Sequence, residues 1–296
     1  MIPVFFSKKQ IVLDDLGASP SARKPLEVIA SWKEQGFPIE IQGPNPATVE
    51  DFNRAHDPDF VRDILTGRRA NGFGTKHLSV AESLPWTTGS MLSAARHVIK
   101  KGVPVAVSPT SGFHHAGYQK AEGFCTFNGL MVTVHALRAD GFTGRIGILD
   151  LDEHYGNGTD DILRKVGKTE ETNVEHYTFG GDTIPRHGGD DWLRRLPGIV
   201  QRFRDCALVL FQAGADPHRD DPFSRGILST EQLHKRDQIV FQGLHAMNVP
   251  VIWNLAGGYQ SPLRKVLDIH DNTMRACTAV YVDQFASPSN NLVQDA

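Results

Sequence analysis

Four short apolar runs rich in Val, Ile and Leu predict buried β-strands. They cover residues 103–107, 145–149, 207–211 and 249–253. Segments with the apolar spacing of helices lie between and beside these runs, at 88–101, 129–139, 190–203, 229–247 and 261–285. This alternation predicts βαβ units, in which a mainly parallel sheet is covered by helices on both faces.

The segments between these elements carry turn signals rather than linker signals. Residues 42–46 and 71–74 are rich in Gly, Pro and Asn and are expected to form loops. Thr48 and Asp51 have the spacing of a capping box, which predicts a short helix after Thr48. Because no linker divides the chain, we expect one domain over residues 1–286, followed by a polar tail at 287–296.

The composition narrows the classes of function. The 296 residues carry a formal net charge of -3, which gives no electrostatic footprint for nucleic acid. The three cysteines are widely spaced and odd in number, which argues against a disulfide framework and fits a reducing compartment. The start has no signal-peptide pattern, and no run approaches the about 18 apolar residues of a membrane helix. We therefore expect a cytoplasmic protein that binds neither nucleic acid nor membrane, with no indication of an oligomer.

Polar residues that could bind a metal or take part in catalysis follow each of the four predicted strands. They are His114 and His115, the run Asp150-Leu-Asp-Glu-His154, Asp216, and Tyr259. Sites in parallel α/β sheets form at the carboxyl ends of the strands, so these four segments are expected to converge on one edge.

The run Asp150-Leu-Asp-Glu-His154 places alternate side chains on one face of an extended chain. Asp150, Asp152 and His154 then share a side and offer the oxygen and nitrogen donors that zinc accepts. An isolated Asp-x-Asp would more often cap a helix, but the histidine after a buried strand favours the metal. Asp216 is the natural third ligand, and a turn-forming Asp is its alternative. His218 is expected to line the rim.

The histidine pair and the tyrosine suit acid–base work and carbonyl polarisation. Adjacent histidines point apart in extended chain, so one of them could simply be exposed. A carboxylate behind the other would raise its basicity, and Asp150 is available if it is not itself a ligand. Tyr259 follows Gly257 and Gly258 and could donate a hydrogen bond to a developing negative charge; its alternative is a surface tyrosine.

Together these residues resemble the histone deacetylase superfamily, which includes bacterial deacetylase-like and acetylpolyamine amidohydrolases. The resemblance rests on five blocks in family order, at 111–116, 123–128, 148–158, 212–216 and 255–259, with a further element at 55–61. It implies a single-domain, three-layer α/β/α arginase/deacetylase fold with a mainly parallel sheet of about eight strands.

The resemblance also implies roles for individual residues. It assigns the metal ligands to Asp152, His154 and Asp216, the charge partners of His114 and His115 to Asp150 and Asn157, the polarising hydroxyl to Tyr259, and the tunnel wall to Gly123 and Phe124. It implies one catalytic Zn²⁺, for which Fe²⁺ or Co²⁺ could substitute. A structural K⁺ near Asp150, Asp152 and His154 is implied as well.

The activity implied is hydrolysis of an N-acyl amine, with His115 as the main base and acid and His114 as its charged companion. The sequence departs from the family pattern at three places. Asn157 replaces an Asp found in some branches, which should leave His115 less basic. Tyr155 replaces a second histidine. Residues 73–86 offer only Glu82 as a weak match to the acid that anchors peptide backbone.

Four functions follow from this interpretation. The first is a deacetylase of a small acylated amine, such as an acetylpolyamine, or of acyl-lysine, and the second is a protein lysine deacetylase. The third, an arginase-like ureohydrolase with two manganese ions, would need a second Asp-x-Asp cluster, whereas Asp220 and Asp221 are expected in a solvated turn. The fourth, an inactive acyl-lysine binding module, is disfavoured because the full set of site residues is present.

Overall fold

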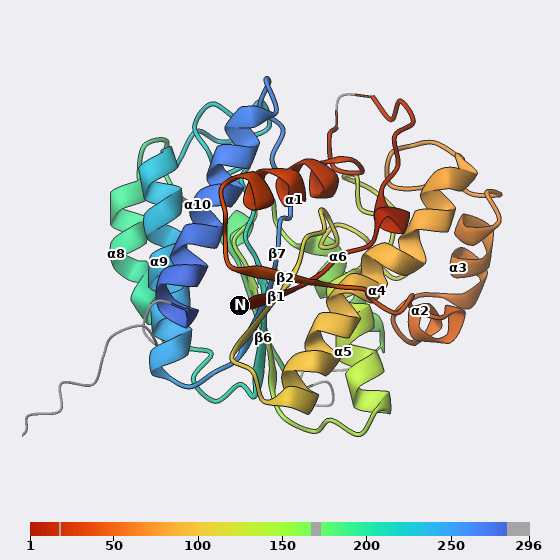
Figure 1. Cartoon of the computed structure of the whole chain (residues 1–296). Coiled ribbons are helices and arrows are strands. Elements are labelled where there is room, and N and C mark those ends of the chain that lie inside the picture. Colours follow the sequence, from red (N-terminus) through yellow and green to blue (C-terminus); the bar gives the residue numbers. More distant parts are fainter. Residues whose placement is uncertain (18, 167–172, 283–296) are drawn as a thin grey trace, which may run out of the picture.

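Seven parallel strands form one sheet in the described part of the chain, which in this computed structural model comprises residues 1–17, 19–166 and 173–282. The strands are β1 (Ile2–Phe5), β2 (Ile39–Gln42), β3 (Val105–Ser108), β4 (Ile146–Asp150), β5 (Val174–Thr178), β6 (Leu208–Gln212) and β7 (Val251–Asn254). Their order across the sheet is β2-β1-β3-β7-β6-β4-β5, and every pair is parallel (Figure 1). The predicted parallel sheet is thus confirmed, with seven described strands against the expected about eight.

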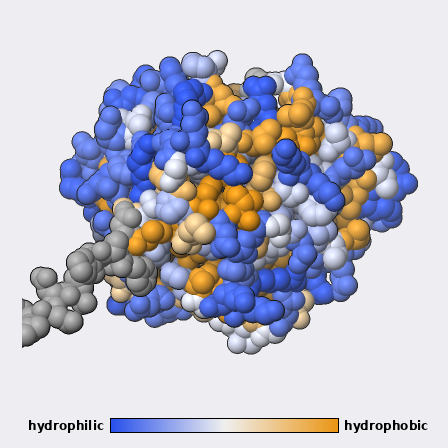
Figure 2. Space-filling model, in the orientation of Figure 1, coloured by the Kyte–Doolittle hydropathy of each residue, from blue (hydrophilic) through white to orange (hydrophobic). Residues whose placement is uncertain are grey.

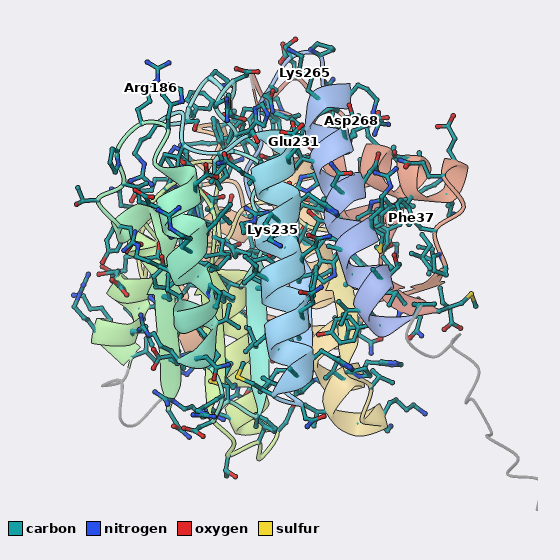
Figure 3. The ribbon with its side chains drawn as sticks, turned by 90° about the vertical axis from the view of Figure 1, so that its left-hand side faces the viewer. Phe37, Arg186, Glu231, Lys235, Lys265 and Asp268 are labelled. Carbon is teal, nitrogen blue, oxygen red and sulfur yellow. The ribbon has the colours of Figure 1, made fainter. Side chains whose placement is uncertain are left out.

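Helices cover both faces of this sheet and give three layers. One core cluster packs the sheet against α1 (Lys24–Glu34), α8 (Gly189–Gln201), α9 (Thr230–Ala246) and α10 (Arg264–Tyr281). A second cluster packs the other face against α2 (Val49–Ala55), α3 (Pro58–Leu65), α4 (Leu78–Lys101), α5 (Gly129–Ala139) and α6 (Asn157–Val166). Two short 3₁₀ helices lie at Lys8–Gln10 and Phe179–Gly181. Figure 3 shows α9 and α10 in front of the sheet, with the charged side chains of Glu231, Lys235 and Asp268 on their outer side.

The predicted elements match these bounds to different degrees. The helix expected at 129–139 is α5 at both ends, and the four predicted strands lie within two residues of β3, β4, β6 and β7. The capping box at Thr48 is confirmed, since its hydroxyl accepts from the Asp51 amide at 3.1 Å. The start of the helix predicted at residue 88 was wrong, because α4 begins at Leu78 and continues through Pro85. The last helix ends at Tyr281; the rest of its predicted range, from 283, and the predicted tail at 287–296 lie outside the described residues.

The surface and the cysteines agree with the composition. Figure 2 shows hydrophilic side chains over most of one face and hydrophobic ones gathered near its middle. Among the described residues, no helix has the length and apolar character needed to cross a bilayer. All three cysteines are buried and free.

Candidate active site

The carboxyl ends of four adjacent strands line up at one edge of the sheet. Asp150, Gln212, Asn254 and Ser108 are register partners across β4, β6, β7 and β3. A polar row follows from this register, because Asn254 donates to Gln212 Oε1 at 3.1 Å and Gln212 donates to Asp150 Oδ1 at 3.2 Å. The convergence predicted from the strand ends is therefore present, and it places the loops after these strands next to one another.

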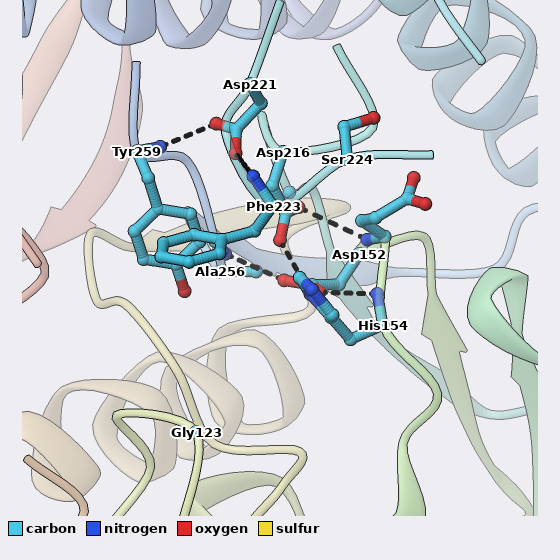
Figure 4. A network of polar contacts seen from close by, with 12 residues as sticks. Gly123, Asp152, His154, Asp216, Asp221, Phe223, Ser224, Ala256 and Tyr259 are labelled. Atoms are coloured by element: carbon cyan, nitrogen blue, oxygen red, sulfur yellow. Dashed lines mark hydrogen bonds and ion pairs between the residues drawn. The ribbon is translucent and has the colours of Figure 1, made fainter. Parts of the chain in front are cut away.

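Asp152, His154 and Asp216 form a candidate metal site above this row (Figure 4). One ligand atom from each lies within 4.8 Å of the others. The Nδ1 atom of His154 lies 3.3 Å from Asp152 Oδ1 and 3.2 Å from Asp216 Oδ2. Both aspartates are buried, at 3% and 0% exposure. Two buried carboxylates and one imidazole match the donor set that zinc accepts, so these residues fit a divalent metal ion.

Backbone groups hold the two carboxylates in place. The amide of Glu153 donates to Asp216 Oδ1 at 3.2 Å, and the amide of Gly257 donates to Asp152 Oδ2 at 2.8 Å. A Cβ at position 257 would lie 2.1 Å from Asp216 Oδ2, so only glycine permits this approach. Gly257, two residues before Tyr259, thereby contacts both carboxylates of the candidate metal site directly.

The two carboxylates of this group have pKa values shifted in opposite directions. Burial opposes the ionisation of Asp152, but the cationic side chains of His114 and His154 outweigh it and hold the pKa of that carboxyl well below its usual range. Burial, reinforced by the charge of Asp152, raises the pKa of Asp216 to about 7. A divalent ion would neutralise both carboxylates, which is a second reason why the group suits a metal.

The paired histidines lie beside this group in different surroundings. His114 is buried, and its Nδ1 lies 2.7 Å from Asp150 Oδ2. Burial alone would lower its pKa, but the nearby carboxylates, Asp150 first, raise the pKa of His114 to about 9. The Nδ1 of His115 lies 2.6 Å from Asn157 Oδ1, and burial together with the neighbouring His114 cation lowers the pKa of His115. One histidine is therefore a cation near neutral pH and the other a neutral base.

Tyr259 lies in an aromatic group at the site. Its ring centroid is 5.5 Å from that of Phe124 and 5.0 Å from that of Phe223. Burial, followed by the charge of Asp216, raises the pKa of Tyr259 well above its usual 10, so the hydroxyl keeps its proton and can donate it in a hydrogen bond. The Tyr259 amide donates to Asp221 Oδ2 at 2.7 Å (Figure 4).

Gly123 and Phe124 lie beside His115 and Tyr259, and their role as a tunnel wall stays a prediction. Gly123 has φ +57, and a Cβ there would lie 2.4 Å from the His115 ring. Phe124 packs on Phe73 as well as on Tyr259, with ring centroids 5.9 Å apart for the former pair. An open groove is lined by His115, Glu122, Gly123, His154, Tyr155 and Asn157. A separate pocket extends from Phe124 and Cys125 towards the N-terminal segment.

Two expectations about neighbouring residues were wrong. Asp221 does not lie in a solvated turn: it is buried and accepts from the amides of Phe223 and Tyr259. His218 does not line the rim: it is buried, and its Nε2 lies 3.0 Å from Thr230 Oγ1 at the start of α9. Both residues instead shape the loop that follows Asp216.

Two residues at the site have no local sequence signal. Phe223 supplies an aromatic wall facing Phe124, at a centroid distance of 6.3 Å, where the resemblance offers no residue. Lys24 is fully buried, and its Nζ donates to the carbonyls of Ala256 at 2.7 Å and Gly257 at 3.2 Å. Burial lowers the pKa of Lys24 to about 8 despite the nearby Asp216. Lys24 comes from α1, far from the site along the chain, so only the fold brings it to the loop that carries Tyr259.

Comparison with known proteins agrees with this architecture. Residues 20–192 match the histone deacetylase domain. Histone deacetylase 2 of Arabidopsis thaliana is 27% identical over 204 residues, which cover 63% of this chain and 52% of the plant protein. The chain is 25% identical to a probable deacetylase of Methanothermobacter thermautotrophicus over 247 residues, 73% of each protein. It thus spans about half the length of the plant relative and about three quarters of the archaeal one.

A bacterial polyamine enzyme is similar in both sequence and fold. Acetylpolyamine amidohydrolase of Burkholderia pseudomallei is 30% identical over 207 residues, 59% of this chain and 57% of that protein. A crystal structure of acetylpolyamine aminohydrolase from the same species superposes with a TM-score of 0.71 at 17% identity, covering 95% of this chain and 99% of the other. The shared fold is therefore that of a deacetylase.

A three-layer α/β protein with an Asp-His-Asp group at the strand ends has a site that could hold a metal ion where active sites of parallel sheets lie. Because the domain match covers more than half of its residues, the chain belongs to the histone deacetylase family, whose members hydrolyse amides.

Proposed function

We propose that this protein is a zinc-dependent amidohydrolase that removes an N-acyl group from an amine. One observation carries the proposal. A metal-ligating group, a histidine pair with opposite pKa shifts and a protonated tyrosine meet at one edge of the sheet. Each component alone has a structural explanation, but together they supply every group that metal-assisted amide hydrolysis needs.

Asp152, His154 and Asp216 would hold the ion. Zinc there supplies a Lewis acid for the acyl carbonyl and lowers the pKa of water from 15.7 to about 7. The same donors would accept Fe²⁺ or Co²⁺, because geometry and availability decide selectivity as much as affinity. The potassium ion near Asp150, Asp152 and His154 stays a prediction, as does the cytoplasmic location.

Three side chains, His114, His115 and Tyr259, would then transfer protons and stabilise charge during the reaction. With its proton on Nδ1, His115 would donate a hydrogen bond to Asn157 Oδ1, and Nε2 would be free to accept a proton from the attacking water. His114, held cationic by Asp150, stabilises negative charge as it develops. Tyr259 donates a hydrogen bond to the acyl oxygen, and His115 returns the proton to the leaving amine.

The mouth of the site favours a small acylated amine over a protein. Phe124, Phe223 and Tyr259 form an aromatic group beside the candidate metal site, and the methylene chain of a substrate would pack on these rings. The residue that we matched weakly to the peptide-anchoring acid, Glu82, is exposed on α4 rather than in a rim loop, because α4 begins at Leu78. A protein lysine deacetylase remains the second candidate, since acyl-lysine ends in the same methylene chain.

Two further alternatives fit the site less well. A binuclear ureohydrolase needs two adjacent metal sites, whereas the described residues contain a single group of the required kind. An inactive binding module would not need oppositely shifted histidines.

Release of acetate by the purified protein tests the proposal. Acetylated polyamines and an acetyl-lysine peptide should be compared at equal concentration, with a chelator and after zinc is restored. We expect zinc-dependent release with a higher kcat/KM for an acetylated polyamine. A preference for the peptide would select the second candidate, and absence of zinc-dependent release from any N-acyl amine would refute the amidohydrolase.

A further inference from the structure

A chain of hydrogen bonds runs from the proposed base outward to the protein surface. His115 Nδ1 lies 2.6 Å from Asn157 Oδ1, and Asn157 Nδ2 donates to Glu122 Oε1 at 2.7 Å. The other carboxylate oxygen of Glu122 forms an ion pair with Lys120. Glu122 thus contacts none of the candidate metal ligands, and a single residue, Asn157, lies between it and the proposed base His115.

Asn157 is the middle residue of this series of hydrogen bonds, and the orientation of its side-chain amide is ambiguous when Asn157 is considered alone. An asparagine amide carries an acceptor oxygen and a donor nitrogen of nearly the same shape, and rotating it by half a turn exchanges them. With Nδ2 turned inward, Asn157 would donate to His115 Nδ1. A neutral histidine would then carry its proton on Nε2, which is the nitrogen that must accept a proton from water.

Glu122 removes this ambiguity because an ionised carboxylate only accepts hydrogen bonds. It can pair with Asn157 Nδ2 but not with Oδ1, so it selects the orientation that offers Oδ1 to His115. We propose that Glu122 is a positioning residue, which through Asn157 fixes the Nδ1-protonated form of His115 and leaves Nε2 free as the base. This inference rests on the proposed function for its catalytic consequence, but not for the tautomer itself.

The local structure holds Glu122 in place for this role. The amide of Glu122 donates to the Cys125 carbonyl at 3.0 Å, and the Cys125 amide donates back to the Glu122 carbonyl at 2.9 Å. This tight loop carries Gly123 and Phe124, which both have positive φ. The Glu122 side chain is 30% exposed, and the ion pair with Lys120 holds its outer oxygen. The carboxylate is therefore anchored on both sides before any substrate binds.

Glu122→Ala is the first test, with Glu27→Ala on the exposed side of α1 as the matched control. We expect kcat of Glu122→Ala to fall about 10- to 100-fold, a share of the 10²–10⁴ that general acid–base catalysis supplies. KM should change less than kcat, because Glu122 lines the open groove beside His115 but is not part of the aromatic group of Phe124, Phe223 and Tyr259. Glu27→Ala should match the unmodified protein.

Rescue separates positioning from a structural role. In the double variant Glu122→Ala with Asn157→Asp, the carboxylate at 157 accepts from His115 in either orientation, so Glu122 is no longer needed. We expect the double variant to regain much of the kcat lost in Glu122→Ala. A collapsed loop would not be repaired by a change at 157.

The tautomer can be read directly and without turnover. In ¹⁵N-histidine-labelled, zinc-loaded protein, correlations between ring nitrogens and carbons report which nitrogen of His115 is protonated, and His115→Gln identifies the signal. About one unit above the ordinary histidine pKa of about 6.5, we expect Nδ1–H in the unmodified protein and a shift towards Nε2–H in Glu122→Ala. An unchanged tautomer, or a kcat loss that Asn157→Asp does not relieve, would overturn the proposal. If the unmodified protein hydrolyses no amide, the proposed function fails while the tautomer still decides the role of Glu122.

Discussion

The two adjacent histidines show how surroundings divide one residue type into two chemical roles. Carboxylates led by Asp150 raise the pKa of His114 to about 9, although burial opposes them. His115 has an amide, Asn157, in the equivalent place; burial and the neighbouring His114 cation lower its pKa, although the hydrogen bond to Asn157 raises it. Pairs of titratable groups whose pKa values are pushed apart are typical of acid–base sites. The expectation that Asn157 leaves His115 less basic than a carboxylate partner would stays a prediction.

Removing one oxygen tests the role of Tyr259. Tyr259→Phe keeps the ring that packs on Phe124 and Phe223 and deletes only the donor. Losing one donor to a developing oxyanion costs about 10²–10³ in rate, so kcat should fall by that factor with the fold intact. Tyr281→Phe on α10 is the matched control, since its hydroxyl reaches only the Phe241 carbonyl at 3.5 Å. Steady-state kinetics decides, and near-normal kcat in Tyr259→Phe would remove the hydroxyl from the mechanism.

The helices and strands differ in how clearly the sequence predicts them. The central strands β3, β4, β6 and β7 are continuous apolar runs, because both faces of a parallel sheet are buried. The edge strand β2 alternates apolar and polar residues and is partly exposed, and β5 at the other edge is similar. Such short mixed segments resemble loops in sequence. Pro85 hid the first part of α4, since proline usually breaks a helix.

In the loop after β7, the backbone at Gly257 lies very close to the carboxylates of Asp152 and Asp216. Gly257→Ala would place a methyl group 2.1 Å from Asp216 Oδ2 and 2.8 Å from Asp152 Oδ2. Because this group cannot be accommodated without moving the carboxylates, we expect zinc stoichiometry and kcat to fall together while the far-UV circular dichroism stays unchanged. Gly198→Ala within α8 is the control: a Cβ there meets nothing within 4 Å, and alanine favours a helix by about 1 kcal/mol. Full zinc occupancy in Gly257→Ala would contradict the packing.

A buried histidine connects α2 to the loops of the site. His56 follows α2; its Nδ1 lies 2.9 Å from the Gly117 carbonyl, and its Nε2 accepts from the Asn128 amide at 2.9 Å. Burial lowers the pKa of His56 to about 4. The unfolded chain therefore binds a proton from about pH 6.5 downward while the folded protein does not, so stability is present at neutral pH and lost as pH falls towards 4.

Urea unfolding at pH 7 and pH 5 tests this linkage, with chelator present to exclude metal effects. At about 1.4 kcal/mol per pKa unit, His56 should account for about 2 kcal/mol of the loss in unfolding free energy between the two pH values. His56→Asn should be less stable at pH 7 but should lose correspondingly less on acidification. His187→Asn, at an exposed position, should lose as much as the unmodified protein. Equal losses in all three proteins would show that His56 is not the linked group.

At the scale of the whole molecule, the site could be predicted where it follows the strands and could not where it depends on the tertiary fold. The strand-end residues are revealed by the apolar runs before them, and parallel topology brings them together. Lys24, Glu122 and Phe223 come from a helix and loops whose placement follows from the packing of the three layers. Asp221 was misjudged for the same reason, because a pair of aspartates before a proline gives no sign of burial.

The candidate metal ligands Asp152, His154 and Asp216 also link function to the stability of the whole fold. Burial and the charge of Asp152 raise the pKa of Asp216, which means that ionising Asp216 beside Asp152 costs free energy when no cation lies between them. Asp216→Asn removes one of the two like charges and keeps the shape. We therefore expect the chelator-treated variant to have a Tm equal to or above that of the chelator-treated unmodified protein, even though the substitution removes a ligand.

Added zinc should reverse the order of the two melting temperatures, so that the unmodified protein melts above Asp216→Asn. An ion bound only by the folded state stabilises it by RT ln(1 + [L]/Kd), about 2.7 kcal/mol at one hundred times Kd. Added zinc should raise the Tm of the unmodified protein by several degrees and that of Asp216→Asn little, while deacetylation is lost in the variant. Asp191→Asn, on the exposed side of α8, should behave as the unmodified protein in both conditions. Differential scanning calorimetry with and without zinc measures both effects. A chelator-treated Asp216→Asn protein that melts well below its parent would contradict the repulsion inferred between Asp216 and Asp152.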